Sequence, residues 1–182
     1  MSTNPISSQK HKTDHSVTQF LTEDHRRLEM LLQSALLSGD RVDQSVYDQF
    51  RAGLLRHIGM EEKILLPTAQ RLRGGEPLAL AARLRLDHGA IAAVLMPTPT
   101  AGLIATLQKI LDKHNLIEEG PEGLYETCDA LAGAESEQLL ARLRAAPELS
   151  VLPHADTPAL LGAVRRALER AGYGELGDSS FL

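Results

Sequence analysis

The chain of 182 residues is long enough for one domain with its own core and an appendage, but two full domains would be crowded. Aromatic residues make up only 3% and tryptophan is absent, while leucine, alanine, arginine and glutamate dominate, a composition that favours packed helices over sheets. A formal net charge of -5 gives no general attraction to phosphate backbones, and few rings are available to stack on bases, so no nucleic-acid partner is expected.

Residues 1–16 are polar and aperiodic, and we interpret them as a disordered N-terminal arm. Their sequence lacks the apolar run that a secretory signal peptide requires. Cys128 is the single cysteine, which excludes an internal disulfide. No segment has the roughly 18 consecutive apolar residues of a membrane-spanning helix. These features predict a cytoplasmic protein with no membrane partner.

Four helical stretches follow the arm, and apolar residues recur in each at helical spacing. Their expected bounds are about 17–37, 42–72, 76–96 and 102–119, the last with a continuation. Clusters rich in Gly and Pro separate them, of the length that joins antiparallel neighbours. The sequence therefore predicts an all-α, up-down-up-down four-helix bundle over residues 17–133.

Two prolines and the C-terminal segment complete the expected organisation. Pro67 lies inside the second helical stretch and Pro121 follows the fourth, so a kink or break is expected near each. Residues 134–182 are predicted to be a C-terminal extension with one helix in SEQLLARLRAAP and another in TPALLGAVRRALERAG. Thr157 is the expected N-cap of the second of these helices, and Gly172 its end.

Each bundle helix is predicted to carry one histidine in its apolar stripe. The second and fourth helices repeat the pattern HxxxEE, as HIGMEE and HNLIEE, and the first and third share Asp-His before apolar residues at matching offsets. This similarity suggests a duplicated helix pair that closes face to face around a polar layer. The residues expected to point inward are His25, His57, Glu61, His88, His114 and Glu118.

The four histidines are also expected at one level of the bundle. At about 1.5 Å rise per residue, His25 and His57 lie roughly 20 and 26 Å from the turn between them, within about one helical turn of the same level. His88 and His114 lie roughly 14 and 18 Å from their own turn. A single layer of four imidazoles and two carboxylates is the predicted result.

Burying such a layer without partners would cost on the order of several kcal/mol per group, and metal ions would supply the compensation. A glutamate one turn beyond its histidine projects from the same helix face, so both can serve one metal centre. The predicted cofactor is two non-haem iron ions (Fe2+/Fe3+) with an oxo or hydroxo bridge and one open position on each ion. Manganese or zinc would satisfy much of the same geometry. A hydrogen-bonded polar core without metal is the alternative.

The pattern H...HxxxE...H...HxxxE resembles the hemerythrin-like (HHE cation-binding) domains, four-helix bundles that hold a non-haem di-iron centre. It covers about residues 17–130, and HIGMEEKILLP is similar to the second-helix signature of the family. The resemblance implies the following metal ligands: His25, His57, Glu61, His88, His114 and Glu118.

The chain departs from the oxygen-carrying members of that family. They have a fifth histidine four residues after the third-helix one, where this chain has Ala92. Their last carboxylate is an aspartate five residues after its histidine, whereas Glu118 follows His114 at four. The chain is thus more similar to the bacterial branch of iron-centre repair proteins and of sensors that respond to peroxide or nitric oxide. It lacks the paired-cysteine module of several repair proteins.

The leading hypothesis is a binding module whose di-iron centre binds or reacts with O2, nitric oxide or peroxide, in redox sensing, stress response or iron handling. Whether it is an enzyme is left open, because a peroxidase, an oxidase or a nitric oxide reductase would need a proton donor near the metals. Tyr125 is the candidate donor, although core packing is the preferred interpretation. An iron-sulfur repair protein is a further alternative.

A third alternative is a helical interaction protein with a metal-stabilised core, which would bind a protein partner or a second copy through its C-terminal helices. Packing of that surface onto the bundle is the preferred interpretation. The surface consists of Leu139, Leu140, Leu143, Leu160, Leu161, Val164 and Leu168.

Several residues near the predicted ligands have a weaker signal. Cys128 is interpreted as a buried small hydrophobe rather than a reactive thiol. Asp24 and Asp87 each precede a histidine, and a contact with a ligand is a hypothesis only, because neighbouring helical residues do not share a face. Glu62 and Glu119 are expected to be surface charges rather than ligands, although Glu119 could substitute as a ligand if the fourth helix is distorted.

Overall fold

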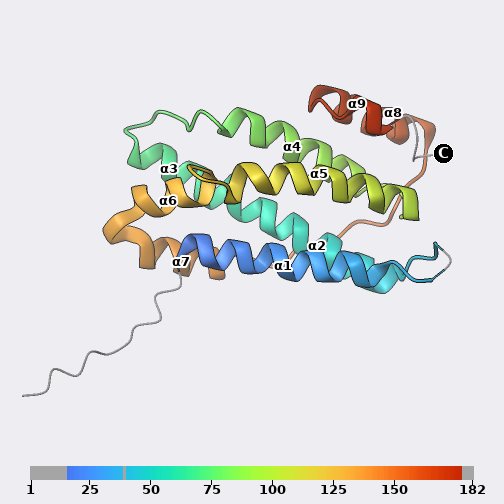
Figure 1. Cartoon of the computed structure of the whole chain (residues 1–182), viewed down its shortest axis with the longest axis horizontal. Helices are drawn as coiled ribbons and strands as arrows, with labels where there is room; N and C mark the ends of the chain where they lie inside the picture. The colour runs from blue at the N-terminus through green and yellow to red at the C-terminus, as the bar shows by residue number, and fades with distance from the viewer. Residues whose placement is uncertain (1–15, 39, 178–182) are drawn as a thin grey trace, which may run out of the picture.

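The computed structural model describes residues 16–38 and 40–177 (Figure 1). The predicted N-terminal arm lies outside the described residues, apart from Ser16. Figure 1 shows four long helices side by side, and no strand occurs in the described ranges. They are α1 (Val17–Ala35), α2 (Gln44–Met60), α4 (Ala81–Val94) and α5 (Ala101–Glu119). The predicted all-α bundle is confirmed.

Side-chain caps begin three of these helices. Ser16 accepts a hydrogen bond from the backbone N–H of the third residue of α1, Asp43 caps α2 and Thr100 caps α5. The start of α4 differs from the prediction, since the helix begins at Ala81 rather than near residue 76. Pro77 explains the difference, because the residue before a proline is disfavoured in helical conformation.

The second helical stretch is interrupted by a π-helical segment, η1 (Glu61–Leu65), and continues as α3 (Leu66–Leu72). The backbone N–H of Leu66 bonds to the carbonyl of Glu61 five residues earlier. This wider turn lies just before Pro67, whose ring would clash with a carbonyl in a regular helix. The distortion expected near the proline is thus a π segment, and it begins at one of the predicted ligands.

The chain breaks after α5, as predicted from Pro121, and turns back through Gly123 into α6 (Leu124–Ala132). A Cβ atom on Gly123 would lie 2.6 Å from the carbonyl oxygen of Glu118, so this tight turn needs a glycine. Asp129 of α6 accepts hydrogen bonds from the backbone N–H groups of Val17 and Thr18. The turn therefore places α6 across the start of α1.

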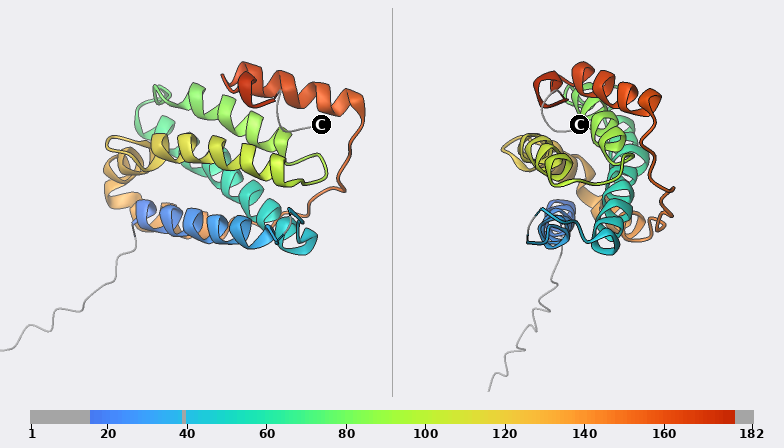
Figure 2. Two further views of the ribbon diagram at one scale, coloured as in Figure 1. Left: turned by 45° about the vertical axis from the view of Figure 1, so that its right-hand side comes forward. Right: turned by 90° about the vertical axis from the view of Figure 1, so that its right-hand side faces the viewer.

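The remaining elements cover the bundle from outside (Figure 2). They are η2 (Gly133–Glu135), α7 (Ser136–Arg144), α8 (Pro158–Arg170) and α9 (Gly174–Gly177). Thr157 caps α8 and Gly172 follows its end at φ 78°, as predicted. The strap between α7 and α8 crosses α2, where Arg51 donates to the carbonyl oxygen of Leu152. No helix in the described ranges combines the length and apolar character needed to cross a membrane.

The leucine-rich face of the C-terminal helices packs largely on their own chain. Leu143 of α7 and Leu168 of α8 are fully buried, and Leu139 and Val164 are nearly so. Leu160 and Leu161 are half-buried. The preferred interpretation of this face, packing onto the bundle, is what the structure shows.

Two apolar clusters form the core, and the polar layer lies between them. One cluster contains Leu28, Leu54, Ile91 and Ile110, and the other contains Leu21, Met60 and Leu84 among others. Along each helix, the histidine of the layer lies between a residue that packs in one cluster and a residue that packs in the other. The layer is therefore sealed by apolar side chains at both ends of the bundle.

Candidate metal centre

The structure brings all six predicted ligands together in the interior of the bundle. The side chains of Glu61 and Glu118 are fully buried, and the histidines are between 1% and 7% exposed. The histidines come from α1, α2, α4 and α5, one from each helix. Helical spacing therefore placed the correct faces inward, and the estimated levels matched.

These side chains form two groups that can each hold one metal ion, since the ligand atoms of each group lie within 4.8 Å of one another. The first group contains His25 and His57, and the second contains His88 and His114. Glu61 and Glu118 belong to both groups. We call the group with His25 and His57 the first position, and the group with His88 and His114 the second position.

The two carboxylates each present one oxygen to each position. Oε1 of Glu61 lies 3.2 Å from Nε2 of His57, and its Oε2 lies 3.2 Å from Nε2 of His88. Oε2 of Glu118 lies 3.4 Å from Nε2 of His25, and its Oε1 lies 3.1 Å from Nε2 of His114. This is the arrangement that two bridging carboxylates between two ions require.

The hydroxyl of Tyr125 contacts all four ligand atoms of the first position. It is 2.7 Å from Oε1 of Glu61 and 3.1 Å from Oε2 of Glu118. It is also 3.0 Å from Nε2 of His25 and 3.1 Å from Nε2 of His57. The preferred interpretation of Tyr125 as a core residue is correct for its ring, which is fully buried. It did not predict the contacts of the hydroxyl with the four ligand atoms. The sequence signal was the Gly123 turn, which aims the start of α6 back at the layer.

The second position lacks such a hydrogen-bonded centre. Oε2 of Glu61, Nε2 of His88 and Oε1 of Glu118 are all buried and make no hydrogen bond, although Nε2 of His88 lies 3.2 and 3.6 Å from the two oxygens. A buried polar atom without a hydrogen bond costs about 1–3 kcal/mol. Three such atoms around one point are accounted for by a cation, so the donor set fits a metal ion.

A carboxylate lies beside the outer nitrogen, Nδ1, of each imidazole, and three of the four make a hydrogen bond to it. Nδ1 of His57 lies 2.9 Å from Asp24, and Nδ1 of His88 lies 2.7 Å from Glu62. Nδ1 of His25 lies 2.5 Å from Oε1 of Glu119. Asp87 lies at a longer 3.6 Å from Nδ1 of His114. We call these acidic residues the outer carboxylates.

The outer carboxylates follow a cyclic rule. Each is the chain neighbour of a ligand and contacts the histidine of the next helix: Asp24 reaches from α1 to α2, and Asp87 from α4 to α5. Glu62 reaches α4, and Glu119 closes the ring from α5 to α1. Neighbouring helical residues point in different directions, and here the second direction meets the adjacent helix. Glu62 and Glu119, expected to be surface charges rather than ligands, are partly exposed and also contact His88 and His25.

Arginines fix three of the outer carboxylates. Asp24 pairs with Arg27 at 2.7 Å and Asp87 with Arg83 at 2.8 Å. Glu62 lies 3.4 Å from Arg85. Glu119 has no arginine partner within residues 16–38 and 40–177, and its side chain is 33% exposed.

The charges of the layer shift the pKa values of its histidines. Burial alone would lower the pKa of His57, but the Glu61 carboxylate and the contact with Asp24 outweigh it and raise the pKa to about 9. Contacts with Glu118, Glu61 and Glu62 likewise overcome burial and raise the pKa of His88 to about 11. Without metal, protons on the imidazoles thus balance the carboxylates, and metal ions would replace those protons.

One known family matches most of the chain. The model of the family described as Hemerythrin HHE cation binding domain matches residues 16–144, which include α1 to α7. Searches among curated proteins and among solved structures find no significant match.

Proposed function

The chain belongs to the hemerythrin HHE cation-binding domain family, and on that premise we propose that its polar layer binds two non-haem iron ions that interact with a small ligand. The observation that carries this proposal is the sharing of Glu61 and Glu118 between two groups of buried ligand atoms. Two carboxylates, each with one oxygen toward either group, are suited to a pair of ions rather than one. Mixed imidazole and carboxylate ligation favours iron, with manganese and zinc as the competing ions.

The proposed ligands differ between the two positions. His25 and His57, with both glutamates and Tyr125, supply five protein ligands to the first ion. His88 and His114, with the same glutamates, supply four to the second. If two six-coordinate ions also shared an oxo or hydroxo ligand, these residues would fill the first position and would leave one place for a small ligand at the second.

Tyr125 can act as a ligand because a bound metal ion lowers the pKa of its hydroxyl, which is raised when no metal is present. Burial, together with the charges of Glu61 and Glu118, raises the pKa of the Tyr125 hydroxyl well above its usual range. A divalent or trivalent cation among the same groups favours the deprotonated oxygen instead. The hydroxyl contacts all four other residues of the first position, so it needs no rearrangement to join them.

The surrounding residues orient the ligands and keep water out. An outer carboxylate accepts from Nδ1–H of His25, His57 and His88, which leaves Nε2 free to bind metal. The two apolar clusters close the layer from above and below along the bundle. Once bound, a pair of irons supplies up to two electrons to O2 or peroxide, or binds nitric oxide.

We propose a binding role, in redox sensing, stress response or iron handling, as the primary function. An enzymatic role as peroxidase, oxidase or nitric oxide reductase is the second candidate, favoured by the Tyr125 hydroxyl 2.7 Å from a bridging carboxylate. Sustained consumption of peroxide with added reductant by the metal-loaded protein would favour the enzyme. A single turnover followed by a stable ligand complex would favour the binding role.

The primary test is elemental analysis of protein purified without an affinity tag or added metal. About two irons per chain are expected, with strong loss in His57→Ala. His154→Ala is the matched control, because His154 contacts Asp48 and Gln44 rather than the polar layer. No stoichiometric metal in the parent, or equal content in the parent and His57→Ala, would contradict the proposal.

A further inference from the structure

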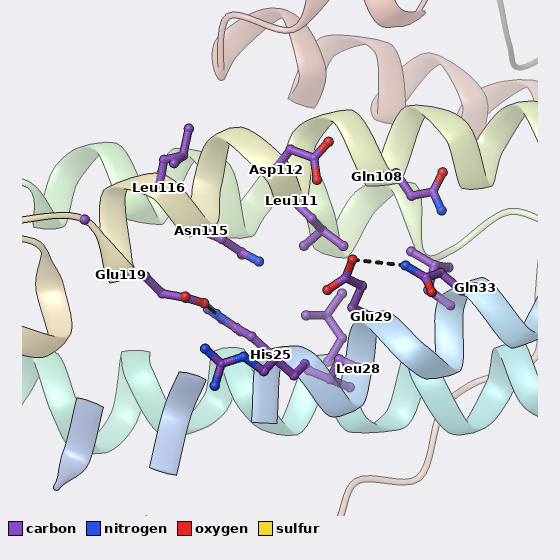
Figure 3. A pocket seen from close by; sticks show the side chains of 14 residues that line it. His25, Leu28, Glu29, Gln33, Gln108, Leu111, Asp112, Asn115, Leu116 and Glu119 are labelled. Carbon is purple, nitrogen blue, oxygen red and sulfur yellow. Dashed lines mark hydrogen bonds and ion pairs between the residues drawn. The ribbon is translucent and has the colours of Figure 1, made fainter. Parts of the chain in front are cut away.

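A groove of about 690 Å³ lies between α1 and α5 and reaches the polar layer at one place. Figure 3 shows His25 and Glu119 facing each other at one end of it, with Leu28 and Leu111 along its length. His25 is the only one of the six proposed ligands that lines this groove, and at 7% it is also the most exposed of them. The groove is therefore an approach to the first position from outside.

The charge of this groove is predominantly negative. Glu29, Asp112 and Glu119 line it, against the single cation Arg26. A second groove of about 490 Å³ runs beside α2 and has the opposite character. Its charged lining consists of Asp24, Glu148, Arg27, Arg56 and Arg144. A divalent cation is attracted to the first groove and repelled by the arginines of the second.

Glu119 also differs from the other outer carboxylates in its freedom to move. Asp24, Glu62 and Asp87 are each paired with an arginine. Glu119 has no arginine partner in the part of the chain that the structure describes, and it is a third exposed. Its carboxylate already contacts His25 at 2.5 Å and also lines the groove, so it lies between the groove and the first position.

We propose that the groove between α1 and α5 is the port through which Fe2+ reaches the centre, and that Glu119 is the positioning residue that passes the ion to His25. This rests on the proposed function, because it presupposes a metal in the polar layer. The hydrated ion is drawn in by the acidic lining and exchanges water for the Glu119 carboxylate. It then moves inward to the nitrogens and oxygens of the first position. No electron or covalent bond is transferred to the protein in this step.

The test is the rate at which metal-free protein takes up Co2+, followed by the visible absorption of the bound ion after rapid mixing. Glu119→Gln keeps an oxygen that accepts from His25 but removes the charge. We expect uptake about tenfold slower, with a weaker dependence on ionic strength, since charge steering alters association rates by this order. The final absorption should match the parent, because Glu119 is not a proposed ligand.

Two further variants distinguish slower metal entry through the groove from damage to the metal site. Glu148→Gln removes a negative charge from the second groove and should leave the uptake rate within about twofold of the parent. Asp112→Asn changes a groove residue that Figure 3 shows on the wall opposite His25, and should slow uptake about two- to threefold.

Parent-like uptake by Glu119→Gln, or equal slowing in Glu148→Gln, would contradict the proposal that this groove is the entry route. If all variants bind Co2+ in the same amount and at the same rate, only the port fails. If the parent takes up no metal, the proposed function fails with it.

Discussion

The two candidate metal positions share Glu61 and Glu118 but differ in what surrounds those carboxylates. In the first, the Tyr125 hydroxyl makes a hydrogen bond to each glutamate. In the second, the facing oxygens of the same glutamates make none. Two groups with the same ligand types are thus made unequal by one residue from outside the four bundle helices. Under the proposed function, this difference would close the first position and leave the second open to a small ligand.

The largest effect is expected from the residues that the positions have in common. Glu118→Ala removes an oxygen from both, so iron content should fall from about two per chain to well below one. Elemental analysis measures this, with Glu23→Ala on the exposed face of α1 as the control. If one full equivalent of iron survives in Glu118→Ala, the carboxylate is not shared between two ions.

Tyr125→Phe should affect one position only. The variant is expected to keep both ions but to bind the first about tenfold more weakly, a loss of about 1.4 kcal/mol. It should also lose the visible absorption of a tyrosine bound to Fe3+ and gain a second place for nitric oxide. Tyr47→Phe is the matched control, because Tyr47 is equally buried but lies in the apolar cluster. An unchanged spectrum in Tyr125→Phe would contradict ligation by this residue.

The metal-free protein should lose stability as pH rises. The folded-state pKa values of His57 and His88, about 9 and about 11, lie above the unfolded value of about 6.5. Their stabilisation is therefore complete below about pH 6.5 and is lost as pH rises through the folded values, by on the order of a few kcal/mol in total.

Thermal unfolding at several pH values measures this loss. Metal-loaded protein should show little of it, because the imidazoles carry metal instead of protons. A metal-free protein equally stable at about pH 6 and pH 10 would contradict the assignment of charge in the layer.

The smallest effect concerns Cys128, one helical turn after Tyr125 on α6. Burial, with help from the charges of Asp129 and Glu61, raises the pKa of its thiol to about 12, so alkylation of the folded protein should be slow. Metal should slow it further if Tyr125 ties α6 to the first ion, and Tyr125→Phe should abolish that added protection. Alkylation rates with and without metal decide this. Equal rates would mean that α6 is held independently of the metal.

Sequence reasoning predicted the bundle and the six inward residues, because helical periodicity fixes which side chains share a face. It missed what depends on irregular backbone. The position of Tyr125 follows from the tight turn at Gly123, and the reach of Glu62 to His88 begins in the π segment that starts at Glu61. The sequence shows the outer carboxylates as the second glutamate of each HxxxEE pattern and as the aspartate before His25 and His88. Their histidine partners lie on neighbouring helices, and the pattern of a single helix does not specify such contacts.

The central claim is that two ions share two carboxylates and that only the first contacts Tyr125. Crystals of the metal-loaded protein, measured by anomalous diffraction at the iron absorption edge, test it most directly. The account predicts two anomalous peaks between Glu61 and Glu118, with the Tyr125 oxygen coordinated to the ion beside His25 and His57. A single peak, no peak in the polar layer, or a tyrosine turned away from both ions would contradict it.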